Sequence, residues 1–140
     1  MGMRRAVVSL VACGVLELSI VAFSAQPAET ALYRCVNDTT VGVTVLGLEL
    51  CDAAPTPRLA ERAEPDNLQT RDGALVVEVD DGGIAAIAGV QSGDMIYRVA
   101  GVDVPGAADA GAGLATVGTD SDTQINFLRE GRPYRIKLRR

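Results

Sequence analysis

The stretch "AAIAGVQSGDMIYRVAGVDV", Ala85–Val104, contains the residues for several predicted turns within a short length. The apolar run Ile84–Ala88 predicts one or two buried helical turns, and Gly89 follows where a helix C-terminus favours a left-handed residue. The segment Gln91–Asp94 predicts a turn, because Gly93 accepts a positive φ and the aspartate carboxylate can bond nearby backbone N–H groups.

Two strands follow this turn. Met95–Val99 consists of residues that favour strands, and Ala100–Gly101 predicts the turn that ends it. Val102 and Val104 then flank Asp103 with the period of two that is typical of a strand. The quoted stretch therefore predicts a short helix and two strands joined by turns.

The segment "VGVTVLGLELC", 41–51, changes its pattern at Gly47. Valines alternate up to Val45, and leucines alternate on the opposite parity from Leu46. A bend or bulge with exposed backbone amides would produce this shift.

The rest of the chain after residue 25 predicts alternating helices and strands. A helix is expected to begin after Thr56 as N-cap, with Pro57 at the first helical position. The other expected elements are a lead-in strand or linker at 26–40, a strand at Gly73–Val79, a glycine-rich helix from Pro105, and a hairpin from Thr123 with its turn at Glu130–Gly131.

The composition fits one globular domain behind a leader. The chain has 140 residues, 48% of them hydrophobic and 22% charged. Arg4 and Arg5 precede an apolar run, and Ala22–Ser24 has small residues at the positions that an export peptidase reads. The expected division is 1–25 as export signal or membrane anchor, 26–40 as linker and 41–140 as the folded domain.

Three fates of the N-terminal segment remain open. Cleavage gives a free exported protein, and retention gives a membrane anchor, although Glu17 within the span would cost about 2.5 to 3.5 kcal/mol on insertion scales. The sequence "LVAC" before and including Cys13 resembles the lipobox of bacterial lipoproteins, which implies lipidation of that cysteine.

Cys35 and Cys51 are the cysteines that remain after the leader. An exported protein can oxidise such a pair, and a loop of about 15 residues would contribute around 3 kcal/mol. A metal site is a poor alternative, since two cysteines without any histidine make an incomplete ligand set. No cofactor is expected, and the formal net charge of −5 disfavours nucleic acid as a partner.

The order of these elements resembles a PDZ domain of the bacterial kind over residues 43–139. The segment "AGVQSGDMIYRVAGVDV" carries most of the resemblance, with Ala100 where the family usually has asparagine. The segment "VLGLEL", 45–50, resembles the family's carboxylate-binding loop and groove strand. The segment "TPRLAER", 56–62, resembles part of the PDZ domains in high-temperature-requirement (HtrA/Deg-type) serine proteases.

The resemblance implies the fold and the binding chemistry. The expected fold class is α+β, a small PDZ-like β-barrel or sandwich of five to six strands with two to three short helices, over residues 41–140. Backbone amides would hold a ligand's terminal carboxylate while its last residues add to the sheet edge. The peptide-binding residues implied are Leu46, Gly47, Leu48, Glu49, Leu50, Leu114 and Val117.

Enzymatic activity is not expected. The chain has no histidine, which excludes the Ser-His-Asp apparatus that accompanies such domains in their proteases. Ser92 and Ser121 lie in predicted turns without a nucleophile context. The aspartates at 80–81 and 120–122 also lie in turn signals, where aspartate is common for conformational reasons.

The sequence thus predicts a non-catalytic exported module in a bacterium, periplasmic or anchored in the inner membrane. It would bind protein C-termini or extended peptide strands by β-augmentation. The alternative is a membrane-anchored scaffold subunit of a secretion or protease complex, similar to a shortened PDZ component of type II secretion. Contact with the membrane is expected only through the N-terminal segment.

Overall fold

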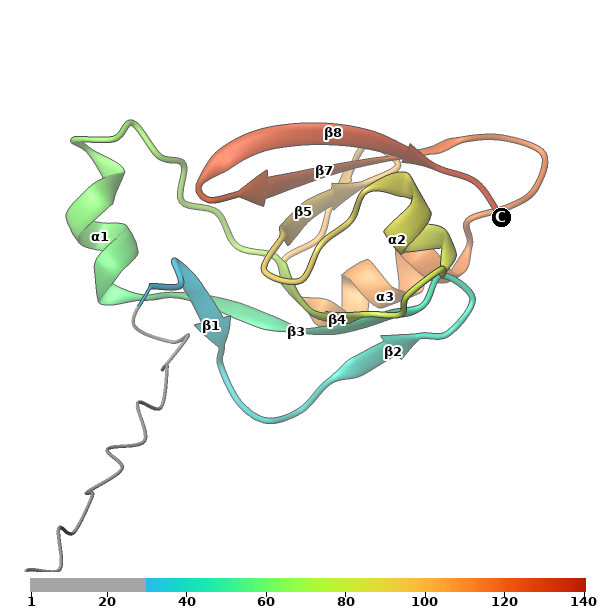
Figure 1. Cartoon of the computed structure of the whole chain (residues 1–140), viewed down its shortest axis with the longest axis horizontal. Helices are drawn as coiled ribbons and strands as arrows, with labels where there is room; N and C mark the ends of the chain where they lie inside the picture. The colour runs from blue at the N-terminus through green and yellow to red at the C-terminus, as the bar shows by residue number, and fades with distance from the viewer. Residues whose placement is uncertain (1–29) are drawn as a thin grey trace, which may run out of the picture.

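The computed structural model describes residues 30–140 (Figure 1). The expected signal or anchor and the lipidation candidate Cys13 lie outside the described residues. Within 30–140, no helix is both long and apolar enough to cross a membrane.

An antiparallel sheet of eight strands forms the body of the domain, and its main path runs β1-β3-β4-β5-β7-β8. The short strand β2 pairs with β3, and β6 pairs with β5. The strands are β1 (Tyr33–Cys35), β2 (Val41–Val43), β3 (Leu48–Pro55), β4 (Ala74–Val79), β5 (Met95–Val99), β6 (Val102–Asp103), β7 (Thr123–Arg129) and β8 (Arg132–Leu138).

Within residues 30–140, three helices flank the sheet: α1 (Pro57–Ala63), α2 (Ile84–Ala88) and α3 (Ala107–Ala115). The larger core cluster contains side chains of α2 and α3, and a second cluster contains Leu59 of α1. Figure 1 shows the β7–β8 hairpin as one layer above the layer of β3 and β4. The α+β class is confirmed, as a sandwich that does not close into a barrel, and the described part of the chain has eight strands instead of five to six.

The stretch 85–104 folds as predicted. Helix α2 ends at Gly89, whose φ of 100° is left-handed and whose N–H donates to the carbonyls of the preceding turn. In the turn before β5, the Asp94 carboxylate accepts a hydrogen bond of 2.8 Å from the Gln91 N–H. Asp94 is also 1% exposed, so the turn residue is part of the interior.

Helix α1 begins at Pro57 after Thr56, as predicted, but the threonine hydroxyl does not cap the helix. It donates to the carbonyls of Ala31 at 2.7 Å and Leu32 at 3.1 Å. The side chain therefore holds the segment that leads into β1. That strand lies inside the predicted linker, in agreement with the lead-in alternative.

The change of pattern at Gly47 corresponds to a hairpin. Strands β2 and β3 pair with Val43 opposite Leu48, and the four residues Thr44–Gly47 form the turn between them. A register shift also occurs within β3, between Glu49 and Leu50. The parity changes because the chain reverses direction, which also separates the valines and leucines into different strands.

Replacing Ala100 with asparagine should stabilise the fold. The turn between β5 and β6 holds Ala100 at φ 51° and Gly101 at φ 79°, the signs of a type I′ turn. Asparagine tolerates the left-handed region that costs other L-residues about 1 to 2 kcal/mol, so we expect a gain of about 1 kcal/mol. Urea unfolding of Ala100→Asn measures it, and an unchanged or lower midpoint would contradict the expectation.

Candidate peptide-binding groove

The residues predicted to bind peptide gather where β3 meets α3. Five of them belong to one apolar cluster and are at most 4% exposed. They are Leu46, Leu48, Leu50, Leu114 and Val117. Gly47 is buried beside them, whereas Glu49 is exposed opposite Glu78 of β4. Val117 lies just beyond the end of α3, and its N–H donates to the Leu114 carbonyl.

The turn 44–47 presents its backbone amides toward the end of β2. The N–H groups of Leu46 and Gly47 both donate to the carbonyl of Val43, at 3.1 and 3.0 Å. Leu46 and Gly47 are two of the residues that the resemblance implies for peptide binding, and their amides belong to the segment expected to hold a ligand carboxylate. In this structure a carbonyl oxygen of the chain itself accepts their hydrogen bonds.

Position 47 requires glycine because of its backbone conformation and because the Asp80 side chain lies close to it. Its φ is +72°, and a Cβ at this position would lie 3.0 Å from the Cβ of Asp80 and 3.2 Å from its Oδ2. The Asp80 N–H donates to the Gly47 carbonyl at 2.9 Å. The predicted carboxylate loop is therefore bordered by an acidic side chain.

Both edges of β3 are paired within the described chain. On one edge the Ala53 N–H donates to Gly73, before β4, and on the other edge the Asp52 carbonyl accepts from Val36, after β1. Strand β1 pairs with Ala53–Pro55 and β2 with Leu48–Leu50, both antiparallel. The edge expected to receive a peptide is thus covered by β1 and β2 in succession (Figure 1).

Helix α3 packs directly against β2. A Cβ on Gly111 would lie 2.7 Å from Cγ1 of Val41 and 3.9 Å from Cγ2 of Val43. Sequence reasoning did not assign Val41, Val43 or Gly111 to the site. The signal available was the glycine within a predicted helix, since glycine there weakens a helix by about 1 kcal/mol relative to alanine unless close packing requires it.

Two further contacts set the positions of α3 and β1 relative to β3. Oδ1 of Asp52 in β3 accepts a hydrogen bond of 2.7 Å from the N–H of Ala107, at the start of α3. A disulfide joins Cys35 of β1 to Cys51 of β3, with 5.5 Å between the Cα atoms. One contact fixes the helix to β3, and the other fixes β1 to the same strand.

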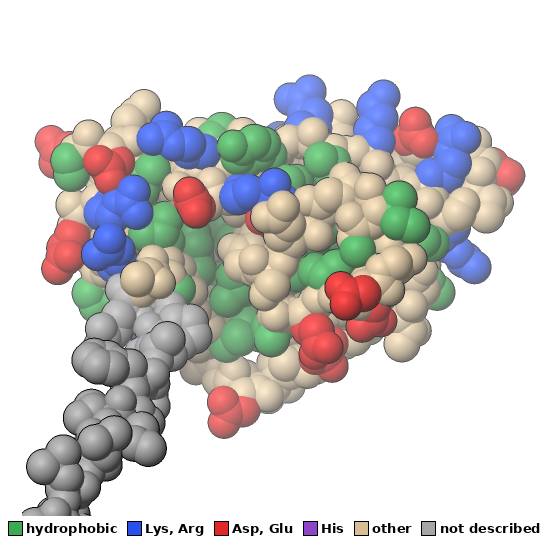
Figure 2. Space-filling view, in the orientation of Figure 1, with side chains coloured by type: hydrophobic (Ala, Val, Ile, Leu, Met, Phe, Trp, Pro, Cys, Tyr) green, Lys and Arg blue, Asp and Glu red, His purple; other side chains and the backbone are tan. Residues whose placement is uncertain are grey.

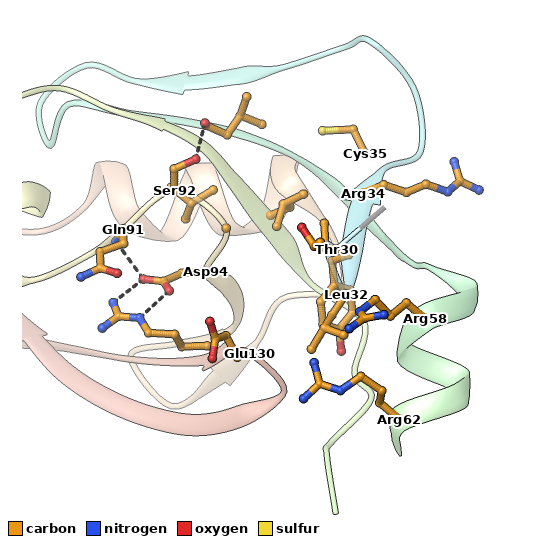
Figure 3. A pocket seen from close by; sticks show the side chains of 17 residues that line it. Thr30, Leu32, Arg34, Cys35, Arg58, Arg62, Gln91, Ser92, Asp94 and Glu130 are labelled. Atoms are coloured by element: carbon orange, nitrogen blue, oxygen red, sulfur yellow. Dashed lines mark hydrogen bonds and ion pairs between the residues drawn. The ribbon is translucent and has the colours of Figure 1, made fainter. Parts of the chain in front are cut away.

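A separate cavity of about 880 Å³ is lined by residues of β1, α1, β4 and the turns before β5 and after β7 (Figure 3). None of the seven predicted peptide-binding residues lines it. Ser92 in this cavity donates to the Val77 carbonyl at 2.8 Å. Its hydroxyl therefore serves the fold of the turn.

An ion pair borders the same cavity (Figure 3). Arg129 donates through Nε to Oδ1 of Asp94 and through Nη2 to Oδ2, both at 2.8 Å. The hydrogen bond to Asp94 raises the pKa of the Arg129 guanidinium above its ordinary value. The pair links the turn before β5 to the end of β7.

Strand β8 carries a group of basic side chains. Figure 2 shows several Lys and Arg side chains along the upper edge, where β8 runs, with Asp and Glu side chains near both ends of that edge and on the lower part of the same face. The exposed basic residues of β8 are Arg132, Arg135 and Lys137. Arginine and lysine on a terminal strand discourage pairing with another sheet edge.

Comparison with solved structures identifies the fold. The chain resembles an HtrA-type protease, AlgW, determined with a decapeptide, with a TM-score of 0.51 and 26% identity, over 67% of this chain and 27% of that one. It also resembles the HtrA3 PDZ domain bound to a phage-derived ligand, FGRWV, with a TM-score of 0.50 and 18% identity, over 72% of this chain and 84% of that one.

Comparison with curated proteins agrees. The chain is 30% identical over 80 residues to a probable periplasmic serine protease, do/HhoA-like, of Haemophilus influenzae, covering 57% of this chain and 17% of the relative. It is 31% identical over 83 residues to the periplasmic pH-dependent serine endoprotease DegQ of Escherichia coli, covering 59% and 18%. No model of a known protein family matches the sequence.

The described residues therefore have the fold of a PDZ domain. More narrowly, the resemblance to the PDZ domains of HtrA-type serine proteases is confirmed, and the match covers only the PDZ part of those enzymes. The chain spans less than a fifth of the length of these curated relatives.

Proposed function

We propose that this chain is a non-catalytic PDZ module, exported to the periplasm, that binds C-termini or extended segments of other proteins. The observation that carries the proposal is the arrangement at the outer edge of β3, where a single short strand, β2, lies between that edge and α3, and the turn 44–47 directs two amides toward the end of that strand. Peptide strands add to sheet edges through main-chain hydrogen bonds, and pockets for alternate side chains give specificity.

Several observations support the remaining parts of this proposal. Two structures with a similar fold hold peptides, and the two curated relatives are periplasmic. The Cys35–Cys51 disulfide suits an oxidising compartment. The similarity is confined to the part of the proteases that lacks their catalytic machinery.

Peptide titration followed by amide chemical shifts tests the function. We expect FGRWV, the ligand of the compared domain, to shift amides of Leu46–Leu50 and α3 with a high-micromolar Kd, because few hydrogen bonds must offset the cost of association. Mass spectrometry afterwards should recover the peptide intact. Shifts confined to the cavity around Ser92, or hydrolysis of the peptide, would contradict the proposal.

Replacing Gly47 with valine tests the position of the site. A Cβ there strains a residue at φ +72° and meets Asp80, so we expect at least a tenfold loss of affinity while the circular dichroism spectrum stays unchanged. The free acid and the amide of FGRWV are compared on both proteins. Tighter binding of the acid indicates that the turn reads a C-terminus, and equal binding indicates addition of an internal strand.

A further inference from the structure

Strand β2 occupies the position of a ligand strand in the proposed groove. It runs antiparallel to β3, with Val43 opposite Leu48 and Val41 opposite Leu50. It also lies between that edge and α3, since its valines approach Gly111. A peptide that extended the sheet along β3 would need the same edge.

The end of β2 also matches the end of a ligand. The carbonyl of Val43 receives the hydrogen bonds of the Leu46 and Gly47 amides. These donors lie where the proposed function places the last backbone oxygen of a bound peptide. The internal strand therefore satisfies the polar groups of the groove as well as its edge.

The side chains of β2 are accommodated specifically. Val43 is 3% exposed and lies in the main core cluster, against which Val41 is packed. Gly111 leaves room for Val41 that an alanine would fill, at the expense of helix propensity. Helix α3 is thus shaped around a valine at this position.

The proposal that follows rests on the proposed function. It names a ligand of the same groove and a way in which binding there is controlled. We propose that Val41–Val43 is an intramolecular ligand, and that the groove takes extended peptides with valine-like side chains two residues apart. The turn 44–47 tethers one end of β2, and the Cys35–Cys51 disulfide anchors the chain before the other. A tethered strand has a high effective concentration, so a free peptide must displace it.

The test uses a labelled peptide of sequence DTTVGV, which is residues 38–43 of this chain, with the full chain as receptor. Val41→Asn combined with Val43→Asn weakens the internal strand. The matched control is Val102→Asn, since Val102 of β6 is 64% exposed. We expect the double variant to bind DTTVGV at least tenfold more tightly than the wild type and the control, and to bind DTTNGN no better than they do.

The outcomes separate the two proposals. Equal binding of DTTVGV by the wild type and the double variant would overturn the internal ligand and leave the proposed function standing. Absence of binding by every folded form, to FGRWV as well as DTTVGV, would overturn both. If the double variant fails to fold, Val41→Thr replaces it, because Val41 is only partly buried and threonine keeps its shape; an affinity equal to that of the wild type would then count against the internal ligand.

Discussion

Replacing Arg129 with methionine should lower the free energy of unfolding by about 3 kcal/mol, because it leaves a buried carboxylate without its partner. The Asp94 side chain is 2% exposed, and Arg129 binds both of its oxygens. Methionine keeps an aliphatic stem near the ring of Phe127, over which the guanidinium lies. The loss in free energy of unfolding therefore measures the ion pair more than the packing of the Arg129 stem.

The pair of Arg98 with Asp103 provides the matched control. Its Nε–Oδ1 distance is also 2.8 Å, but the two side chains are 41% and 75% exposed. Arg98→Met should cost at most about 1 kcal/mol, as exposed pairs do. Urea unfolding at neutral pH, followed by circular dichroism, measures both variants, and similar losses would show that the burial of Asp94 does not govern the effect.

Removing the disulfide is the second change from which we expect a large loss in free energy of unfolding. Cys35 and Cys51 are separated by 16 positions, and closing a loop of about this length stabilises a fold by about 3 kcal/mol in the chain-entropy model. The double variant Cys35→Ala, Cys51→Ala should lose a similar amount. Amide exchange should rise first in β1 and in the loop that leads to β2, since β1 has only three residues.

Reduction of the wild-type protein separates the crosslink from the side chains. Dithiothreitol opens the bond without removing any atom from the core, where Cys51 is fully buried. Most of the loss expected for the double variant should therefore appear in the reduced wild type. An unfolding midpoint that is the same with and without reductant would contradict the assigned stabilisation.

The sequence was most informative where turns are encoded by particular residues. Gly89 ends α2 with a left-handed φ, and Glu130 with Gly131 forms the turn of the β7–β8 hairpin with positive φ at both positions. These conformations limit the residues that fit. The start of helix α1 and both ends of strand β5 follow from equally local signals and were predicted correctly.

The sequence could not reveal which element covers the edge of β3. A period of two identifies strands, but it does not say which strands become neighbours. The valines of β2 and the leucines of β3 therefore read as one strand with a bulge, although the chain reverses at Thr44–Gly47. The close contact of Gly111 with Val41 joins residues 70 positions apart, and only the three-dimensional fold brings them together.

The stretch 85–104 and the groove are built from different parts of the chain. Asp94 in that stretch bonds to Gln91 and Arg129, whereas the groove is formed by 41–50 and by α3 with the residues after it. Substitutions in the segments of the proposed groove therefore leave the residues of the Gly-Asp turn and its ion pair unchanged. Two proteins can therefore share that turn and the fold and still differ in their binding partners, which have to be established one protein at a time.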